Sequence, residues 1–320
     1  MTQLLLAGGA GFIGSHLADR LLRRADVSAL TVVDKLWTGR PENLSHIDDP
    51  RLRCVQADAE HFESDARYDE IDHLASPASP PWYMAEPLRT VSANVRGTMN
   101  LLHRLRDGGL FCHASTSEVY GGPLVSPQPE SYRGSVDCTG PRSSYDESKR
   151  CSESLLFEAQ RTQRVRVKVV RLFNVFGPRT RPDDGRAVSN FVTQALRGQP
   201  ITVYGDGKQS RCFTHVHDVV RAFIDLMDKE GSYGEVFNIG NPVEISIGDL
   251  AKQIREMCGS KSEIVYIPYD KAYEEGFEDM PRRVPDLGKL RALTGYEPSV
   301  HLDEILDRVI EYFTSDKART

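Results

Sequence analysis

Tyr145 and Lys149 lie four residues apart in the segment Tyr-Asp-Glu-Ser-Lys, and such a pair can transfer a proton. On a helix, residues i and i+4 share one face, so the Lys149 ammonium is expected beside the Tyr145 phenol. A free tyrosine has a pKa of about 10, and a neighbouring cation favours its phenolate. Tyr145 would then take a proton from a substrate hydroxyl near neutral pH. Removal of that proton frees the carbinol carbon to give a hydride to a nicotinamide.

A glycine loop upstream of this pair, Gly8-Gly9-Ala10-Gly11-Phe12-Ile13-Gly14, is typical of a dinucleotide site because it follows a strand-like run and precedes a helical pattern. In that context Gly8 permits a tight turn, Gly11 lets the backbone approach a pyrophosphate, and Gly14 allows close packing of the helix. The pyrophosphate would meet the unpaired N–H groups at the start of the helix.

The cofactor is expected to be NAD rather than NADP. Asp34 ends the second strand-like run, twenty residues after Gly14, where an adenosine ribose would lie. A carboxylate there accepts hydrogen bonds from both ribose hydroxyls and repels a 2′-phosphate. Lys35 and Arg40 act in the opposite direction, since a nearby cation tolerates that phosphate. Asp58, after the third strand-like run, is expected to contact adenine.

Composition excludes several classes of protein. The chain has 320 residues, 39% of them hydrophobic, and a formal net charge of −6, so no basic field would draw it to nucleic acid or anionic lipid. Six cysteines without CxxC spacing indicate free thiols in a reducing compartment. No apolar run reaches the roughly 18 residues that span a membrane, and the first residues lack the charged region of a signal peptide. We therefore expect a cytoplasmic protein.

The histidines show no ligand spacing, and no metal site is expected.

Apolar runs alternate with amphipathic segments through the first half of the chain. Six runs are expected to be buried strands: Leu4–Leu6, Leu30–Val33, Leu52–Val55, Ile71–Leu74, Leu110–Ala114 and Val165–Leu172. Three segments have helical patterns: Ile13–Arg24, Leu88–Arg106 and Tyr145–Gln163. This alternation predicts an α/β fold, a Rossmann-type doubly wound parallel sheet with a smaller α/β substrate-binding lobe over its carboxyl edge. The expected division is 1–175 and 212–240 for NAD, and 176–211 and 241–315 for the nucleotide sugar.

Longer motifs carry a resemblance to a known family. They are GGAGFIGSHLADRL, VVDKLWTGR, HLASPASPPWYM, ASTSEVYG, GPRSSYDESKR, RLFNVFGPR, DGRAVSNFVTQAL, VYGDGKQSRCF and PRRVPDLGKL. Together they resemble the extended short-chain dehydrogenase/reductases, and within these the UDP-glucuronate decarboxylases, also called UDP-xylose synthases. The segment HLASPASPP followed by Tyr83, and Pro141-Arg142 before Tyr145, resemble the decarboxylases specifically. Lys35, Ser148 and residues 132–139 depart from the family pattern.

The resemblance implies a mechanism and a set of site residues. Oxidation at sugar C4 makes the carboxylate on C5 part of a β-keto acid, which loses carbon dioxide to give an enolate, and the C4 ketone is then reduced. Tyr145 would be the base at O4, Lys149 would hold the cofactor ribose, and Thr116 would bond the same oxygen as Tyr145. Ser117 and Glu118 would lie near C5 and C6. Dehydratases carry Asp at the position of Ser117, which has no comparable proton to give, so dehydration is disfavoured.

The remaining expected contacts fall into two groups. The NAD site would comprise Gly8, Gly11, Phe12, Ile13, Asp34, Lys35, Trp37, Thr38, Asp58, Ala59, Leu74, Ser76, Ala114, Tyr145, Lys149, Val175 and Arg186. The substrate contacts would be Arg211 and Asn174 at the diphosphate, Asn190 and Tyr204 at the nucleoside, Arg283 near C5 and C6, and Tyr83 and Arg142 around the carboxylate. Forked arginine donors suit a diphosphate better than lysine does.

Two other functions stay open on the sequence. A UDP-glucuronate 4-epimerase, or another NAD-dependent nucleotide-sugar epimerase or dehydratase, would use the same catalytic pair. A non-catalytic protein that senses a dinucleotide would need no combination of Tyr145, Lys149 and Thr116. The product is also open, since the intermediate can be reduced to UDP-xylose or partly released as UDP-4-keto-pentose. The apolar positions of the helical segments 88–106 and 145–163 predict a homodimer across a two-fold axis.

Overall fold

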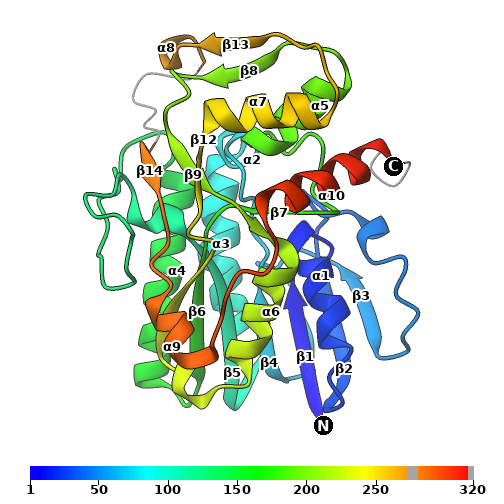
Figure 1. The fold of residues 1–320 in the computed structure, drawn as a ribbon. Coiled ribbons are helices and arrows are strands. Elements are labelled where there is room, and N and C mark those ends of the chain that lie inside the picture. The colour runs from blue at the N-terminus through cyan, green and yellow to red at the C-terminus, as the bar shows by residue number, and fades with distance from the viewer. Residues whose placement is uncertain (273–279, 316–320) are drawn as a thin grey trace.

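A parallel β-sheet forms the centre of the molecule. The computed structural model describes residues 1–272 and 280–315 (Figure 1). Within these residues the largest sheet has seven parallel strands in the order β11-β6-β5-β4-β1-β2-β3. Their bounds are β1 Thr2–Ala7, β2 Val27–Asp34, β3 Leu52–Gln56, β4 Tyr68–His73, β5 Leu105–Thr116, β6 Arg166–Leu172 and β11 Glu235–Ile239. The predicted Rossmann-type parallel sheet is confirmed.

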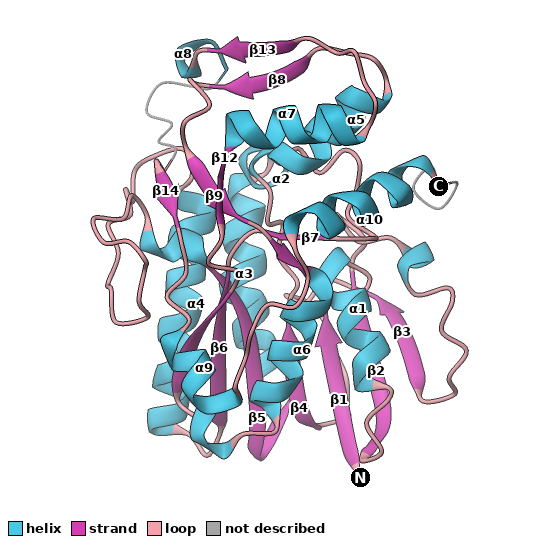
Figure 2. Cartoon of the chain, viewed as in Figure 1, coloured by secondary structure: helices cyan, strands magenta, loops and turns pink. Residues whose placement is uncertain are grey.

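Helices cover both faces of this sheet, because inner strands such as β1 are apolar on both sides. In β1, Leu4 and Leu6 pack into one core cluster, while Leu5 and Ala7 pack into another on the opposite face. The helices of the first face are α1 Phe12–Leu21, α6 Val216–Met227 and α9 Gly288–Thr294. The helices of the second face are α3 Pro87–Leu102 and α4 Ser143–Thr162, which pack against each other. The result is a three-layer arrangement (Figure 2).

A smaller α/β part lies beyond the carboxyl ends of the strands, where Figure 1 shows α5, α7, β8 and β13. Its helices are α5 Ala187–Leu196, α7 Ile247–Met257, α8 Tyr269–Ala272 and α10 Leu302–Thr314. Its strands are β8 Ile201–Tyr204 with β13 Ile264–Ile267, and β9 Ser210–Cys212 between β12 Glu244–Ser246 and β14 Arg282–Arg283. A separate apolar cluster joins α5, α7 and α10.

The remaining elements are short. They are β7 Val175–Phe176, which pairs with β10 Thr214–His215, the helix α2 Pro80–Ala85, and the 3₁₀ turns η1 Pro41–Asn43, η2 Ser117–Tyr120 and η3 Glu230–Ser232. The expected division of the chain at 175, 211 and 240 stays a prediction. Leu290 of α9 belongs to the core cluster of α1 and α6, which favours assigning α9 to the sheet-based part.

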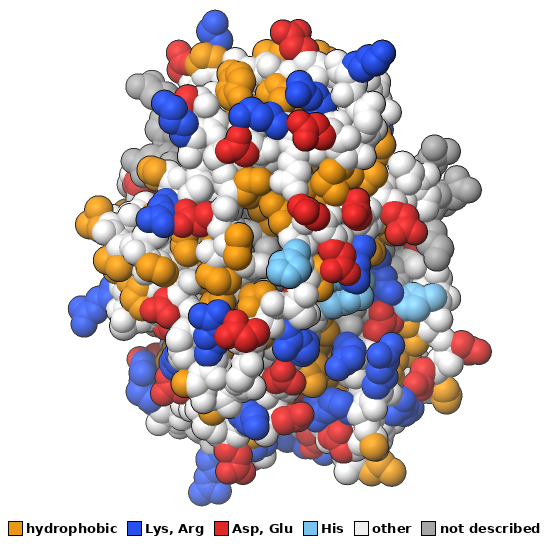
Figure 3. All heavy atoms as spheres, viewed as in Figure 1, with side chains coloured by type: hydrophobic (Ala, Val, Ile, Leu, Met, Phe, Trp, Pro, Cys, Tyr) orange, Lys and Arg blue, Asp and Glu red, His pale blue; other side chains and the backbone are white. Residues whose placement is uncertain are grey.

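Two expected helices end earlier than predicted. The pattern over Ile13–Arg24 ends as a helix at Leu21, and that over Leu88–Arg106 ends at Leu102. The reason for the second is strand pairing, because Leu105 already pairs with Tyr68 at the start of β5. No described helix is long and apolar enough to cross a membrane, and the described residues contain no group of three potential metal ligands. Basic and acidic side chains are interspersed on the face that Figure 3 shows.

Candidate active site

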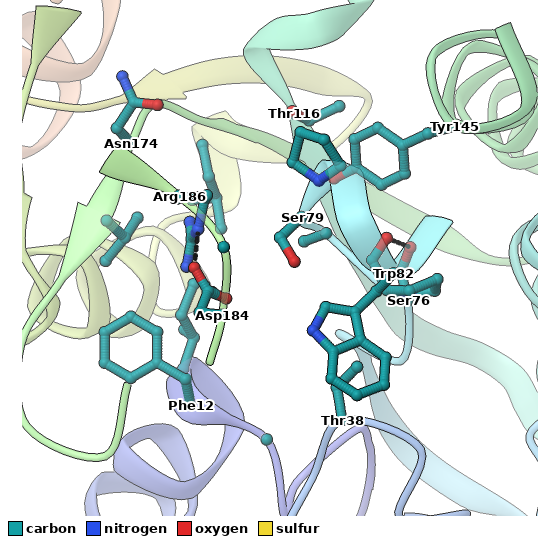
Figure 4. Close-up of a pocket in the computed structure, with 18 of the residues that line it drawn as sticks. Phe12, Thr38, Ser76, Ser79, Trp82, Thr116, Tyr145, Asn174, Asp184 and Arg186 are labelled. Carbon is teal, nitrogen blue, oxygen red and sulfur yellow. Dashed lines mark hydrogen bonds and ion pairs between the residues drawn. The ribbon is translucent and has the colours of Figure 1, made fainter. Parts of the chain in front are cut away.

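A cavity of about 360 Å³ lies where the carboxyl ends of the strands meet the smaller part. The ends of β1, β2, β4, β5 and β6 all reach it, as expected for a doubly wound sheet. Figure 4 shows part of the cavity lining, with Phe12 from the start of α1, Thr38 from the loop after β2, and Asn174 and Arg186 from later segments. All the residues expected in the cofactor and substrate sites line it except Tyr83. Residues far apart in the sequence are therefore brought together as the motifs predict.

The glycine loop is packed too tightly for side chains at two positions. Gly8 has φ +82°, and a Cβ there would lie 2.6 Å from the backbone nitrogen of Ala75. A Cβ at Gly14 would lie 2.1 Å from the carbonyl oxygen of Gly8. Gly11 is the N-cap of α1, and no side chain caps this helix. The loop thus presents the start of α1 to the cavity, which fits the pyrophosphate of a dinucleotide.

Asp34 is fixed at the end of β2 by backbone donors. Its Oδ2 accepts the N–H of Ala10 at 3.0 Å, and its Oδ1 accepts the N–H of Leu36 at 2.8 Å. Burial raises the pKa of Asp34, and these backbone hydrogen bonds oppose the rise. The carboxylate therefore has a set orientation at the position where the ribose of NAD is expected.

Lys35, which departs from the family pattern, interacts with a carboxylate and with an aromatic ring. Its Nζ lies 2.8 Å from Oδ2 of Asp58 and 4.5 Å from the ring centroid of Trp37. The guanidinium of Arg89 lies 4.5 Å from the same ring. Burial acts to raise the pKa of Asp58, but the bond from Lys35 lowers it below its usual value. Lys35 therefore has its charge partly balanced beside the expected adenine and ribose positions.

Tyr145 and Lys149 share the buried face of α4, near its first turn. Burial raises the pKa of Tyr145, and a hydrogen bond with Thr116 opposes this rise. Lys149 donates from Nζ to the carbonyl oxygen of Ala114 at 2.8 Å. Burial lowers its pKa to about 7, while Glu153 acts to raise it. The cation that chiefly lowers the pKa of the phenol in this arrangement is Arg186, so the expected influence of Lys149 is not the main one.

Tyr83 lies behind Tyr145 rather than in the cavity. The two rings are stacked with centroids 4.9 Å apart and planes 5° apart. The Tyr83 side chain is buried, and its hydroxyl has no hydrogen-bond partner among the described residues. The role expected for Tyr83 around the sugar carboxylate stays a prediction. The stack fixes the plane of the Tyr145 ring from the side of α2.

Thr116 ends β5, and Ser117 and Glu118 begin η2 at the same end of the cavity; all three residues are buried. The hydroxyl oxygen of Thr116 accepts the N–H of Glu118 at 3.2 Å and so caps η2. Glu118 makes ion pairs with two arginines: Arg142, which directly precedes α4, and Arg283, which lies in β14. Oε1 of Glu118 lies 2.7 Å from Nη1 of Arg283. Two guanidinium groups thus meet beside Tyr145.

The expected diphosphate and nucleoside contacts lie in the smaller part, except Asn174, which lies between β6 and β7. Arg211 of β9 is the register partner of Arg283 in β14, and both are buried. Asn174 donates from Nδ2 to the carbonyl oxygen of Cys212 at 3.2 Å, and its Oδ1 lies 3.4 Å from Nη1 of Arg283. Adjacent strands therefore present neighbouring arginines to the cavity, a pattern that suits a diphosphate and a carboxylate together.

Further cavity residues were not predicted from the sequence. Asp184 binds the Arg186 guanidinium through both carboxylate oxygens, at 2.5 and 3.3 Å, as Figure 4 shows. Trp82 lines the cavity in place of its neighbour Tyr83. Tyr269 also lines it, and its hydroxyl accepts from Nε2 of Gln209 at 3.0 Å. Asp184 and Trp82 lie inside the motifs DGRAVSNF and HLASPASPPWYM, but no motif marks Tyr269.

Comparison with known proteins identifies the family. Residues 4–240 match the NAD dependent epimerase/dehydratase family. The chain is 43% identical over 319 residues to UDP-glucuronic acid decarboxylase 1 of Xenopus tropicalis, an alignment that covers 98% of this chain and 72% of that protein. The fold is similar to that of a dTDP-glucose 4,6-dehydratase from Streptomyces venezuelae solved with NAD bound, with a TM-score of 0.87, 28% identity and coverage of 99% and 98%. It is also similar to the UDP-glucuronic acid 4-epimerase of Bacillus cereus, with a TM-score of 0.84, 26% identity and coverage of 97% and 98%. By sequence and by fold, this chain belongs to the NAD dependent epimerase/dehydratase family.

Proposed function

We propose that the protein is an NAD-dependent UDP-glucuronate decarboxylase that forms UDP-xylose. The observation that carries the proposal is the meeting of Arg142 and Arg283 at Glu118 beside Tyr145. Two guanidinium groups at the catalytic tyrosine suit a sugar that carries a carboxylate next to its reacting carbon. The near full-length identity to UDP-glucuronic acid decarboxylases supports the same substrate and reaction.

NAD is the cofactor, and when bound it takes a hydride from sugar C4 and later returns it. Tyr145 takes the proton of the C4 hydroxyl as that carbon is oxidised, with Thr116 bonded to the phenol. The C5–C6 bond of the resulting β-keto acid then breaks, its electrons pass into the C4 carbonyl, and carbon dioxide leaves. Arg283 would stabilise the enolate oxygen, and protonation at C5 followed by reduction at C4 restores the hydroxyl.

The expected roles of the other site residues are part of the same proposal. Lys149 would hold the cofactor ribose from the buried face of α4, and Asp34 would accept hydrogen bonds from the adenosine ribose. Arg211 and Asn174 would bind the diphosphate. The nucleoside would lie between α5 and β8, where Asn190 and Tyr204 line the cavity.

Assembly and location also remain proposals. Leu88, Val91 and Met99 of α3 are exposed apolar residues and form a stripe along the helix. An exposed apolar stripe supports a homodimer through α3 and α4. Six free cysteines support a reducing, cytoplasmic location.

The test is incubation of the purified protein with UDP-glucuronate, with measurement of released carbon dioxide and NMR of the products. Carbon dioxide with UDP-xylose is the expected result, and NMR also measures any UDP-4-keto-pentose released. Formation of UDP-galacturonate without carbon dioxide would identify the protein as the 4-epimerase. No turnover of UDP-glucuronate or of any other nucleotide sugar would favour a dinucleotide-sensing protein.

A further inference from the structure

Asp146 lies at the wall between the main cavity and a second cavity of about 230 Å³. Arg142 lines both cavities, whereas Asp146 lines only the second. Most of the second lining comes from the loop between η2 and α4. Asp146 is therefore placed to act on the sugar site through Arg142 and Glu118 rather than by contact with the sugar.

The surroundings of Asp146 favour its neutral form. Its side chain is buried, with the residue 5% exposed, and its Oδ1 has no hydrogen-bond partner among the described residues. An ionised carboxylate in such a place loses hydration without a compensating bond. The titratable and charged groups that face it are Glu118 from η2, Arg142, Tyr145 and Glu147 from the start of α4, Tyr83 from α2 and Arg283 from β14. Burial and then Glu118 raise the pKa of Asp146 to about 8, against the two arginines.

The charges around Glu118 explain why the protonation of Asp146 matters for the binding of a carboxylate. Arg142 and Arg283 carry two positive charges, and Glu118 cancels one of them. One unit of positive charge therefore remains for the carboxylate of a bound sugar. An ionised Asp146 would cancel that unit. The carboxylates of Glu118, Asp146 and the sugar would then face only two guanidinium groups, and repulsion between these like charges would weaken binding of the sugar.

We propose that Asp146 is a positioning residue that must carry its proton for Arg142 and Arg283 to accept the carboxylate of the nucleotide sugar. The inference rests on the proposed function, because it requires a substrate with a carboxylate. It gives the residue after the catalytic tyrosine a part in substrate selection, since a neutral sugar would not sense the charge of Asp146.

The experiment measures the KM for UDP-glucuronate from pH 6.5 to 9.5 in wild type, Asp146→Asn and Glu147→Gln. A group that titrates near pH 8 and must be protonated raises the KM about tenfold between pH 7 and pH 9. We expect this rise in wild type and in Glu147→Gln, whose carboxylate is the neighbouring one on α4. Asp146→Asn, which cannot ionise, should show a rise of less than about twofold.

UDP-glucose, used as a competitive inhibitor, provides the control for binding of the UDP group without a sugar carboxylate. Its inhibition constant should vary little with pH in all three proteins, because it lacks the carboxylate, and retained inhibition shows that the variants are folded. A flat KM in wild type would overturn the inference, as would a rise in Asp146→Asn equal to that of wild type, or a loss of the rise in Glu147→Gln. Absence of carbon dioxide release from wild type would instead overturn the proposed function.

Discussion

Arg283 of β14 reaches Glu118 of η2, with Nη1 of the arginine 2.7 Å from Oε1 of the carboxylate. The contact joins the smaller part of the molecule to the turn η2, which directly follows strand β5. Because β14 also pairs with β9 at Arg211, a single two-residue strand links the catalytic end of the cavity to the expected diphosphate contact.

Arg283→Ala should slow carbon dioxide release by about 10²–10³-fold, the range for loss of one group that stabilises developing negative charge. Binding of UDP and of NAD should persist, because Arg211 and the glycine loop remain. Arg282→Ala is the matched control, since Arg282 is exposed and pairs with Glu244 at the surface. Assay of carbon dioxide release and calorimetry with UDP check both statements. Equal losses in the two variants would contradict the role given to Arg283.

Tyr145→Phe should remove proton transfer, a contribution of typically 10²–10⁴-fold, while leaving UDP affinity almost unchanged. Phenylalanine keeps the stack on Tyr83, so the variant separates the hydroxyl from the ring. Carbon dioxide release and NADH absorbance after addition of UDP-glucuronate measure the effect. Full activity in this variant would show that the base is another residue.

The sequence predicted the parts of the site that local patterns determine. The glycine loop, Asp34 at the end of β2, and Tyr145 with Lys149 on one helix face all follow from spacing along the chain. The hydrogen-bond acceptor of Lys149 could not be predicted from the sequence, because packing of α4 on β5 brings the carbonyl of Ala114 to the Lys149 ammonium. The stack of Tyr83 on Tyr145 did not follow from the sequence either, because it depends on how α2 packs against α4.

NAD should bind more tightly than NADP, and Asp34→Ala should narrow the difference. The fixed Asp34 carboxylate repels a 2′-phosphate, whereas the charge of Lys35 is partly balanced by Asp58. Calorimetric titration of the NAD-free protein with both cofactors measures the preference. Lys35→Asn is a useful companion variant, because loss of this cation should widen the preference for NAD. Equal affinities of wild type for the two cofactors would refute the argument from Asp34.

Asp146 should make the folded protein less stable as the pH rises. Burial raises its pKa from the ordinary value of 3.8 to about 8 in the folded protein. Between these values the folded state holds a proton that the unfolded state has lost, so the free energy of unfolding falls with increasing pH. Asp146→Asn should therefore gain stability relative to wild type as the pH rises from 5 to 8. Urea denaturation at several pH values tests this, and a constant difference across the range would contradict it.

The exposed stripe on α3 predicts the site of dimerisation. Leu88, Val91 and Met99 are 85%, 38% and 46% exposed, and their spacing places them along one side of the helix. A charge in such a stripe is costly to bury against a second copy, so Val91→Glu with Met99→Glu should shift a homodimer to monomers. Val243→Glu changes an exposed apolar residue outside α3 and serves as the control. Light scattering at micromolar concentration gives the molecular mass of each protein. A monomeric wild type would show that α3 buries its apolar side only within one chain, and a dimer that survives the double change would place the contact elsewhere.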